Sequence, residues 1–263
     1  MPNRIDQKFA DLKARGRKGF VAYISAGDPS LEATKSLALA LEKAGVDILE
    51  LGVPFSDPLA DGIVNQLAAQ RALEAGATVL GVLDTIRAIR KESQIPIVLY
   101  TYVNPVYKYG FAKFHHDAAG AGVDGLLILD LPPEEDQGEF ANSAGLKRIR
   151  LIAPTTPPAR IREITAKADG FIYYVSREGV TGEQSSVAAS LPAQVAEIRK
   201  TTSLPLAVGF GVSNPEHVRE IAQSADAVVV GSAIVKRIAT HGKDADLVAQ
   251  VVAFVQPLVD ALR

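Results

Sequence analysis

The chain has 263 residues, of which 48% are hydrophobic and 22% charged, a composition typical of a folded globular protein and not of a disordered one. Lys and Arg number 28 against 30 Asp and Glu, so the net charge of -2 argues against general nucleic-acid binding, and no apolar run reaches the ~18 residues of a membrane span. The absence of cysteine excludes disulfides, thiolate nucleophiles and cysteine-bound metals, and with the charged stretch Met1 to Gly19 it favours a cytoplasmic protein without a secretion signal.

Apolar segments alternate with helical patterns along the whole chain. The predicted strands are 19–25, 46–51, 95–102, 123–129, 147–153, 169–175, 204–209 and 225–230. Most of them show little polar alternation, which is typical of strands buried on both faces of a parallel sheet. Apolar residues at spacings of three and four predict helices between them, for example over 31–44 and 192–201.

Repeated strand–helix units over this length predict an α/β protein with a (β/α)8 TIM barrel, formed as a single domain over residues 1–263. A doubly wound open sheet is the alternative. An extra N-terminal helix over 4–15 is expected to close the barrel floor, and an amphipathic helix over 245–262 is expected on the outer ring. Asp28-Pro29 and the capping pattern Ser213-Asn214-Pro215-Glu216 predict two further helix starts.

Two connections are longer than the others, and both follow the carboxyl end of a predicted strand. The first contains PFSDPLADG, Pro54 to Gly62, and the second contains SREGVTGEQSS, Ser176 to Ser186. Active sites of TIM barrels are built at this end of the strands, and unusually long loops are often functional. We therefore expect functional residues in or beside both loops.

Glu50 lies near the end of the second predicted strand. Because side chains alternate along a strand, it shares a face with Val46 and Ile48, and its carboxyl group is expected among apolar neighbours. Loss of water there raises a carboxyl pKa, which suits a residue that donates and recovers a proton near neutral pH. The alternative is a structural carboxylate paired with Lys or Arg from a neighbouring strand.

Asp61 supplies a second carboxylate in the loop that follows, and Asp57 lies four residues before it. Asp61 precedes a predicted helix over 63–75, so a simple N-cap is the alternative to a catalytic role. Two carboxylates in unlike environments are a common way to separate acid–base work from charge stabilisation. No histidine lies near them, which disfavours a metal site, and the four histidines are expected on helix surfaces. They are His115, His116, His217 and His241.

Glycines after the last three predicted strands favour a phosphate site. They are Gly182, Gly209 and Gly211 around Phe210, and Gly231 before Ser232. Exposed backbone N–H groups and following helix starts suit an anion, and such sites recur at these positions in TIM barrels, although ordinary turn glycines are the alternative. The third glycine of a dinucleotide-binding fingerprint is missing after Gly211, so a Rossmann site is rejected. The sequence has no G-x-S-x-G elbow, and no lysine lies in the carboxyl-terminal half of a predicted strand, which leaves acid–base chemistry without a covalent intermediate.

The chain resembles the tryptophan synthase α subunit family through nearly its whole length. The segments that carry the resemblance are Leu49 to Gly62 (LELGVPFSDPLADG), Phe20 to Pro29, Tyr173 to Gly182, Gly209 to Ser213 and Gly231 to Val235. One departure is Ile63, where most members are expected to have proline, and this change concerns loop stiffness more than chemistry.

The resemblance implies a TIM-barrel lyase that cleaves indole-3-glycerol phosphate to indole and glyceraldehyde 3-phosphate without an organic cofactor or metal. By resemblance, Glu50 is the catalytic acid–base, Asp61 the second catalytic carboxylate and Tyr173 an active-site tyrosine. The implied phosphate contacts are Gly182, Phe210, Gly211, Gly231 and Ser232.

The resemblance also implies a pyridoxal-phosphate β subunit as partner, in an αββα complex that passes indole through a tunnel, with no nucleic acid or membrane partner. Asp57 and Asn104 to Val106 would then lie at the contact. Two other functions stay open on the residues alone. One is a phosphosugar isomerase or epimerase on the same scaffold, and the other is a non-catalytic subunit that activates a partner enzyme.

Overall fold

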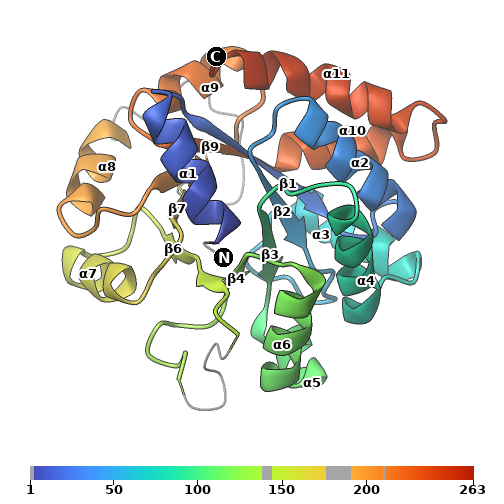
Figure 1. The fold of residues 1–263 in the computed structure, drawn as a ribbon, viewed down its shortest axis with the longest axis horizontal. Helices are drawn as coiled ribbons and strands as arrows, with labels where there is room; N and C mark the ends of the chain where they lie inside the picture. Colours follow the sequence, from blue (N-terminus) through green and yellow to red (C-terminus); the bar gives the residue numbers. More distant parts are fainter. Residues whose placement is uncertain (1–2, 138–143, 176–190, 210) are drawn as a thin grey trace.

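The computed structural model describes residues 3–137, 144–175, 191–209 and 211–263 (Figure 1). Strands and helices follow one another in repeated units, as the apolar segments predicted, with two helices in succession at α3–α4, α5–α6 and α10–α11. In chain order the elements are α1 Arg4–Ala14, β1 Gly19–Ser25, α2 Leu31–Lys43, β2 Ile48–Gly52, α3 Ile63–Glu74, α4 Val79–Arg90, β3 Ile97–Thr101, α5 Val103–Tyr109, α6 Phe111–Ala121, β4 Gly125–Ile128, β5 Lys147–Arg148, β6 Arg150–Ile152, α7 Pro158–Ala166, β7 Ile172–Val175, α8 Leu191–Arg199, β8 Leu206–Gly209, α9 Pro215–Ala222, β9 Ala227–Val230, α10 Ser232–His241 and α11 Leu247–Asp260.

The strands of the described residues form one parallel sheet in the order β5-β4-β3-β2-β1-β9-β8-β7-β6. Its two ends, β5 and β6, are separated in the chain by Ile149 alone. β5 pairs with β4, β6 pairs with β7, and the amide of Ile149 donates to the carbonyl of Leu126, so one continuous segment closes the sheet. The closed order confirms the predicted (β/α)8 barrel and excludes an open doubly wound sheet.

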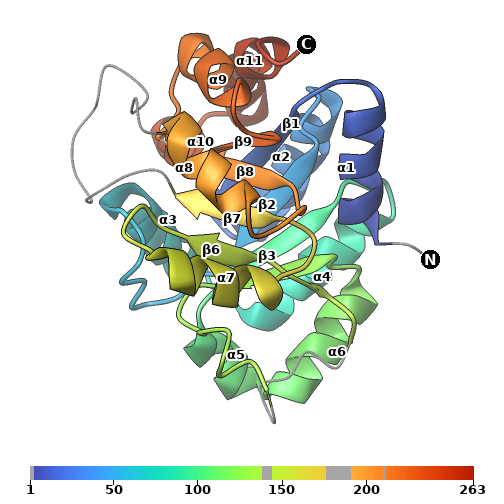
Figure 2. The same cartoon turned by 90° about the vertical axis from the view of Figure 1, so that its left-hand side faces the viewer.

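Two apolar layers hold the barrel together. The outer layer lies between the strands and the surrounding helices and includes Phe20, Leu37 and Leu99. The inner layer contains strand residues such as Val21, Ile48 and Val98, and Ile5, Phe9 and Leu12 of α1 pack against it. Figure 2 shows α1 at one end of the barrel and α3 at the other, so α1 is the predicted floor helix.

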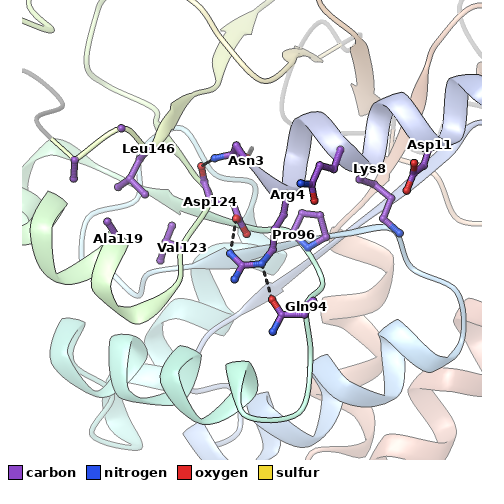
Figure 3. Close-up of a pocket in the computed structure, with 13 residues that line it drawn as sticks. Asn3, Arg4, Lys8, Asp11, Gln94, Pro96, Ala119, Val123, Asp124 and Leu146 are labelled. Atoms are coloured by element: carbon purple, nitrogen blue, oxygen red, sulfur yellow. Dashed lines mark hydrogen bonds and ion pairs between the residues drawn. The ribbon is translucent and has the colours of Figure 1, made fainter. Parts of the chain in front are cut away.

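A buried carboxylate fixes the start of α1 to the floor. Asp124 is 3% exposed and pairs with Arg4 and with Arg90, each at 2.9 Å. Arg4 also donates to the side-chain oxygen of Gln94, and the side chain of Asn3 donates to the carbonyl of Asp124 (Figure 3). Two cations around one buried anion compensate the loss of water from Asp124, so these ion pairs hold α1 at the end of the barrel where β4 begins.

Three local expectations differ from the structure. Asp28 does not cap α2, because Ser30 occupies the cap and the Asp28 carboxylate accepts two hydrogen bonds from Arg71. The cap of α9 is Asn214, not Ser213, because the Asn214 side chain reaches the amide of His217. His115 is 1% exposed, since it lies on the face of α6 that packs inward and not on the surface.

Candidate active site

A cavity of about 460 Å³ opens at the carboxyl ends of the strands. It is lined from β1, β3, β7, β8 and β9 and from the segments that follow β2, β8 and β9. The lining residues are Tyr23, Ala60, Asp61, Gly62, Asn65, Tyr100, Tyr173, Val175, Gly209, Gly211, Val212, Val229, Gly231 and Ser232. Five of the predicted site residues thus meet in one place, while the predictions for Gly182 and Phe210 lie outside the described residues.

Glu50 is fully buried in the wall beside this cavity. It lies on β2 between Tyr23 of β1 and Val98 of β3 in the strand register, and it is not among the residues that line the cavity. Neither carboxyl oxygen has a hydrogen-bond partner within the described part of the chain, and burial raises the pKa of Glu50 to about 8. The expected apolar burial is confirmed, and pairing with a described Lys or Arg is excluded.

Two tyrosines link Glu50 to the cavity. Tyr23 and Tyr173 both line it, and burial raises the pKa of each hydroxyl well above its usual value. The charges of Glu50 and Asp61 raise the pKa values of these hydroxyls further. Both tyrosines therefore stay protonated at neutral pH, and they stand close enough to Glu50 to interact with it electrostatically.

Asp61 is 6% exposed and is held by three side-chain donors. The hydroxyl of Tyr102 donates to one carboxylate oxygen at 2.8 Å, and that of Tyr100 donates to the other at 3.0 Å. Asn65 adds a longer contact at 3.4 Å. Burial raises the pKa of Asp61, and these three hydrogen bonds lower it in part. Asp61 is not a helix cap, because Gly62 occupies the cap position of α3 without a side-chain bond.

Tyr100 and Tyr102 were not expected in the site from the sequence. They lie two residues apart at the end of the predicted strand 95–102, so they point to one side of the sheet at its carboxyl end. A pair of phenols at that position resembles ordinary core aromatics, and the carboxylate they bind is about forty residues earlier in the chain. The available signal was their place at the strand end, facing the same side as Glu50 on the next strand.

Glycines at or just after the ends of β8 and β9 keep the other side of the cavity open. A Cβ atom on Gly209 would lie 3.0 Å from the hydroxyl oxygen of Tyr173, and one on Gly231 would lie 3.4 Å from the Cβ of Tyr23. Gly211 has a φ of 62°, in the left-handed region that favours glycine. Gly231 precedes Ser232, the first residue of α10, so the positive end of a helix dipole faces this side.

The chain matches, over residues 9–263, the family model described as tryptophan synthase alpha chain. The tryptophan synthase alpha chain of Opitutus terrae is 53% identical over 238 residues, 90% of each chain. The chain belongs to the tryptophan synthase alpha chain family. The crystal structure of tryptophan synthase subunit alpha from Legionella pneumophila has a TM-score of 0.88 at 38% identity, covering 100% of this chain and 99% of that one.

The tryptophan synthase complex structure from Pyrococcus furiosus contains another similar chain, with a TM-score of 0.85 and 35% identity over 93% of this chain and 99% of that one. As a member of the tryptophan synthase alpha chain family, the protein is a carbon–carbon lyase of tryptophan biosynthesis that cleaves indole-3-glycerol phosphate to indole and glyceraldehyde 3-phosphate. This membership sets aside the isomerase and the purely non-catalytic subunit. Among the described helices, none is both long and apolar enough to cross a membrane.

Proposed function

We propose that Glu50 is the proton donor and acceptor of the cleavage and that Asp61 is the anion that stabilises its intermediate. The observation that carries this proposal is the contrast between the two carboxyl groups at one end of the barrel. Glu50 has no polar partner among the described residues and a pKa of about 8, so it is mostly neutral at pH 7. Asp61 accepts hydrogen bonds on both oxygens, which favours its charged form.

The first step is protonation of the indole ring. Direct cleavage of the bond between C3 and the glycerol side chain would leave an electron pair on an aromatic carbon. Neutral Glu50 instead donates its proton to C3, which makes the ring a cation. Asp61 accepts a hydrogen bond from the indole N–H and stabilises this cation with its negative charge.

The second step breaks the carbon–carbon bond. Glu50, now an anion, removes the proton from the hydroxyl on the carbon attached to C3. The oxygen forms a carbonyl, the bond to C3 breaks, and its electron pair restores the neutral aromatic ring. Indole and glyceraldehyde 3-phosphate result, and Glu50 ends in the protonated form in which it began.

This role requires the Glu50 side chain to turn from the wall into the cavity, because it does not line the cavity in the structure. No hydrogen bond within the described residues opposes that rotation, since both carboxyl oxygens lack a partner there. Tyr23 and Tyr173 line the cavity and interact with Glu50, so they are the side chains that would make room.

We propose that the substrate phosphate binds a phosphate cradle formed by Gly209, Gly211, Gly231 and Ser232. Backbone N–H groups beside glycines can approach an anion closely, and the start of α10 favours negative charge. Binding the phosphate supplies energy away from the reacting carbon and holds that carbon in position. Gly182 and Phe210 stay predictions for the same site, and Tyr173 is proposed as its aromatic wall.

We also propose a tryptophan synthase β subunit as partner, in an αββα complex. Three large apolar side chains in this part of the chain are mostly exposed, Leu59 by 81%, Ile63 by 64% and Tyr107 by 61%, and exposed apolar surface of this kind supports a protein contact. Leu59 lies in the loop after β2 that also holds Asp57, Ile63 begins α3, and Tyr107 lies on α5 after Asn104. Pro105 and Val106 of that helix are buried, so the predicted contact at these two positions does not agree with the structure. Biosynthesis of an amino acid supports a cytoplasmic location.

Substitution of the two carboxyl groups tests the proposal. Glu50→Gln keeps the shape but cannot exchange a proton, so indole release should stop while a substrate analogue still binds. Asp61→Asn should lower kcat by more than tenfold, a loss above about 1.4 kcal/mol in transition-state stabilisation. The measurement is indole formation from indole-3-glycerol phosphate. Near-normal turnover by Glu50→Gln, or a loss below tenfold for Asp61→Asn, would remove the assigned role.

A further inference from the structure

Tyr100 connects three parts of the site although it has no role in the scheme above. Its hydroxyl donates to Asp61 across 39 positions of the chain, and its ring lines the cavity. Its ring and that of Tyr23 make an edge-to-face contact, with centroids 5.0 Å apart and planes at 68°. A phenol with a fixed ring and one hydrogen bond to a carboxylate has a defined orientation.

The neighbouring backbone is adapted to this packing. Gly52 of β2 is the register partner of Tyr100, and a Cβ atom at Gly52 would lie 2.3 Å from the hydroxyl oxygen of Tyr23. A side chain at position 52 would therefore displace Tyr23 from the edge contact with Tyr100. Glycine at the end of β2 lets the two tyrosines meet, and this contact directs the Tyr100 hydroxyl toward Asp61.

The loop that carries Asp61 needs such an anchor. Asp61 lies at the end of the loop before α3. The cap residue of that helix, Gly62, makes no side-chain hydrogen bond that could fix the loop. The Tyr102 hydroxyl donates to one carboxylate oxygen and also accepts a hydrogen bond from the backbone amide of Ala60, so it holds the loop backbone. Tyr100 donates to the other carboxylate oxygen, and within the described part of the chain its hydroxyl makes no second hydrogen bond, so it acts on the carboxylate and not on the loop backbone.

We propose that Tyr100 is a positioning residue whose hydroxyl fixes the Asp61 carboxylate in the orientation and charge state that receives the indole N–H. This proposal rests on the proposed role of Asp61. A hydroxyl donor stabilises the anion over the acid, and on this oxygen it is the shorter of two contacts, at 3.0 Å against 3.4 Å for the Asn65 amide. The charge of Asp61 raises the pKa of four tyrosine hydroxyls around it, those of Tyr23, Tyr100, Tyr102 and Tyr173. Glu50 raises the pKa of Tyr23 and Tyr173 as well, and Asp130 that of Tyr102.

Tyr100→Phe tests the proposal because it removes one oxygen and keeps the ring. We expect kcat to fall about tenfold at pH 7 with a small change in KM, as for loss of a hydrogen bond to a charged group. The hydrogen bond lowers the pKa of Asp61, so its loss should move the acid limb of the kcat profile to higher pH. Tyr109→Phe is the matched control, because Tyr109 also donates to an aspartate, Asp117, but outside the cavity.

A double variant separates action through Asp61 from a direct effect. In the Asp61→Asn background, adding Tyr100→Phe should change kcat by less than about twofold, because the group it serves is already gone. Full additivity, or a wild-type acid limb in Tyr100→Phe, would overturn the inference. Tyr100→Met gives a second protein that lacks the hydroxyl, should the first fold poorly. Wild-type activity of Asp61→Asn would instead defeat the proposed function, so the two failures are distinguishable.

Discussion

Burial makes the charged form of the Glu50 carboxyl group unfavourable in the folded chain. Its pKa is raised by burial from 4.5 to about 8, and the side chain is 0% exposed. The folded state therefore binds a proton that the unfolded state releases between these two pH values. The stability that depends on the neutral acid is complete below about pH 4.5 and is lost as the pH rises toward 8.

Glu50→Gln should for this reason stabilise the protein at alkaline pH while removing activity. The free energy of unfolding of Glu50→Gln minus that of the wild type should increase from pH 5 to pH 8, on the order of 3 kcal/mol. Urea denaturation at the two pH values measures it. A difference that stays constant with pH would show that Glu50 titrates normally in the folded chain.

The individual site residues differ in how far they could be predicted. Glu50 could be predicted because burying an acidic side chain within an apolar strand costs free energy, which indicates a functional role. Asp61 was ambiguous, since an aspartate before a helix is most simply a cap. The structure decides against a cap, because Gly62 takes that position and the Asp61 carboxylate accepts from Tyr100 and Tyr102. The burial of His115 was missed because helical periodicity defines an inward face less sharply than strand alternation does.

At the scale of elements, the strands were predicted well because parallel strands are apolar along their whole length. β1 has the predicted bounds, and β2 begins two residues later than expected. The division of 147–153 into β5 and β6 was not predicted, because it depends on which neighbour each half pairs with. Pairing partners are distant in sequence, so local composition does not encode them.

The turn after β8 gives a prediction at this scale. Gly211→Val places a β-branched residue at a φ of 62°, which costs about 1–2 kcal/mol and distorts the phosphate cradle. Binding of glycerol 3-phosphate should weaken about tenfold in a calorimetric titration. Gly120→Ala is the control, because Gly120 lies on α6 with open space at its Cβ position. Equal affinity for Gly211→Val and wild type would place the phosphate elsewhere.

At the scale of the whole molecule, counting strand–helix units was enough to predict the barrel, since few closed arrangements fit eight units of this length. The exposed apolar surface at Leu59, Ile63 and Tyr107 was not predicted from composition, because exposure depends on what packs over each residue. Of the observations on the sequence, only the resemblance to the family predicted a β subunit at the loop after β2 and at α5.

Leu59→Asp tests this surface as a docking site. A charge at an exposed apolar position should weaken binding of a tryptophan synthase β subunit at least tenfold, because the aspartate loses water in the contact. Indole formation by the isolated chain should change by less than about twofold. Ala253→Asp adds the same charge on the outer helix α11 as a control. Undiminished co-elution of Leu59→Asp with the β subunit would exclude Leu59 from the contact.

The order of strands around the barrel also sets a length scale for its ligands. β9, which ends at the cradle, and β2, which carries Glu50, are separated only by β1. Two strand spacings of about 4.8 Å place the phosphate and the acid roughly 10 Å apart along the wall. In the proposed scheme, the chain between the phosphate and the indole ring must span about this distance, because Glu50 acts on the carbon attached to C3. The spacing of three neighbouring strands therefore selects the length of the side chain that joins the phosphate to the ring.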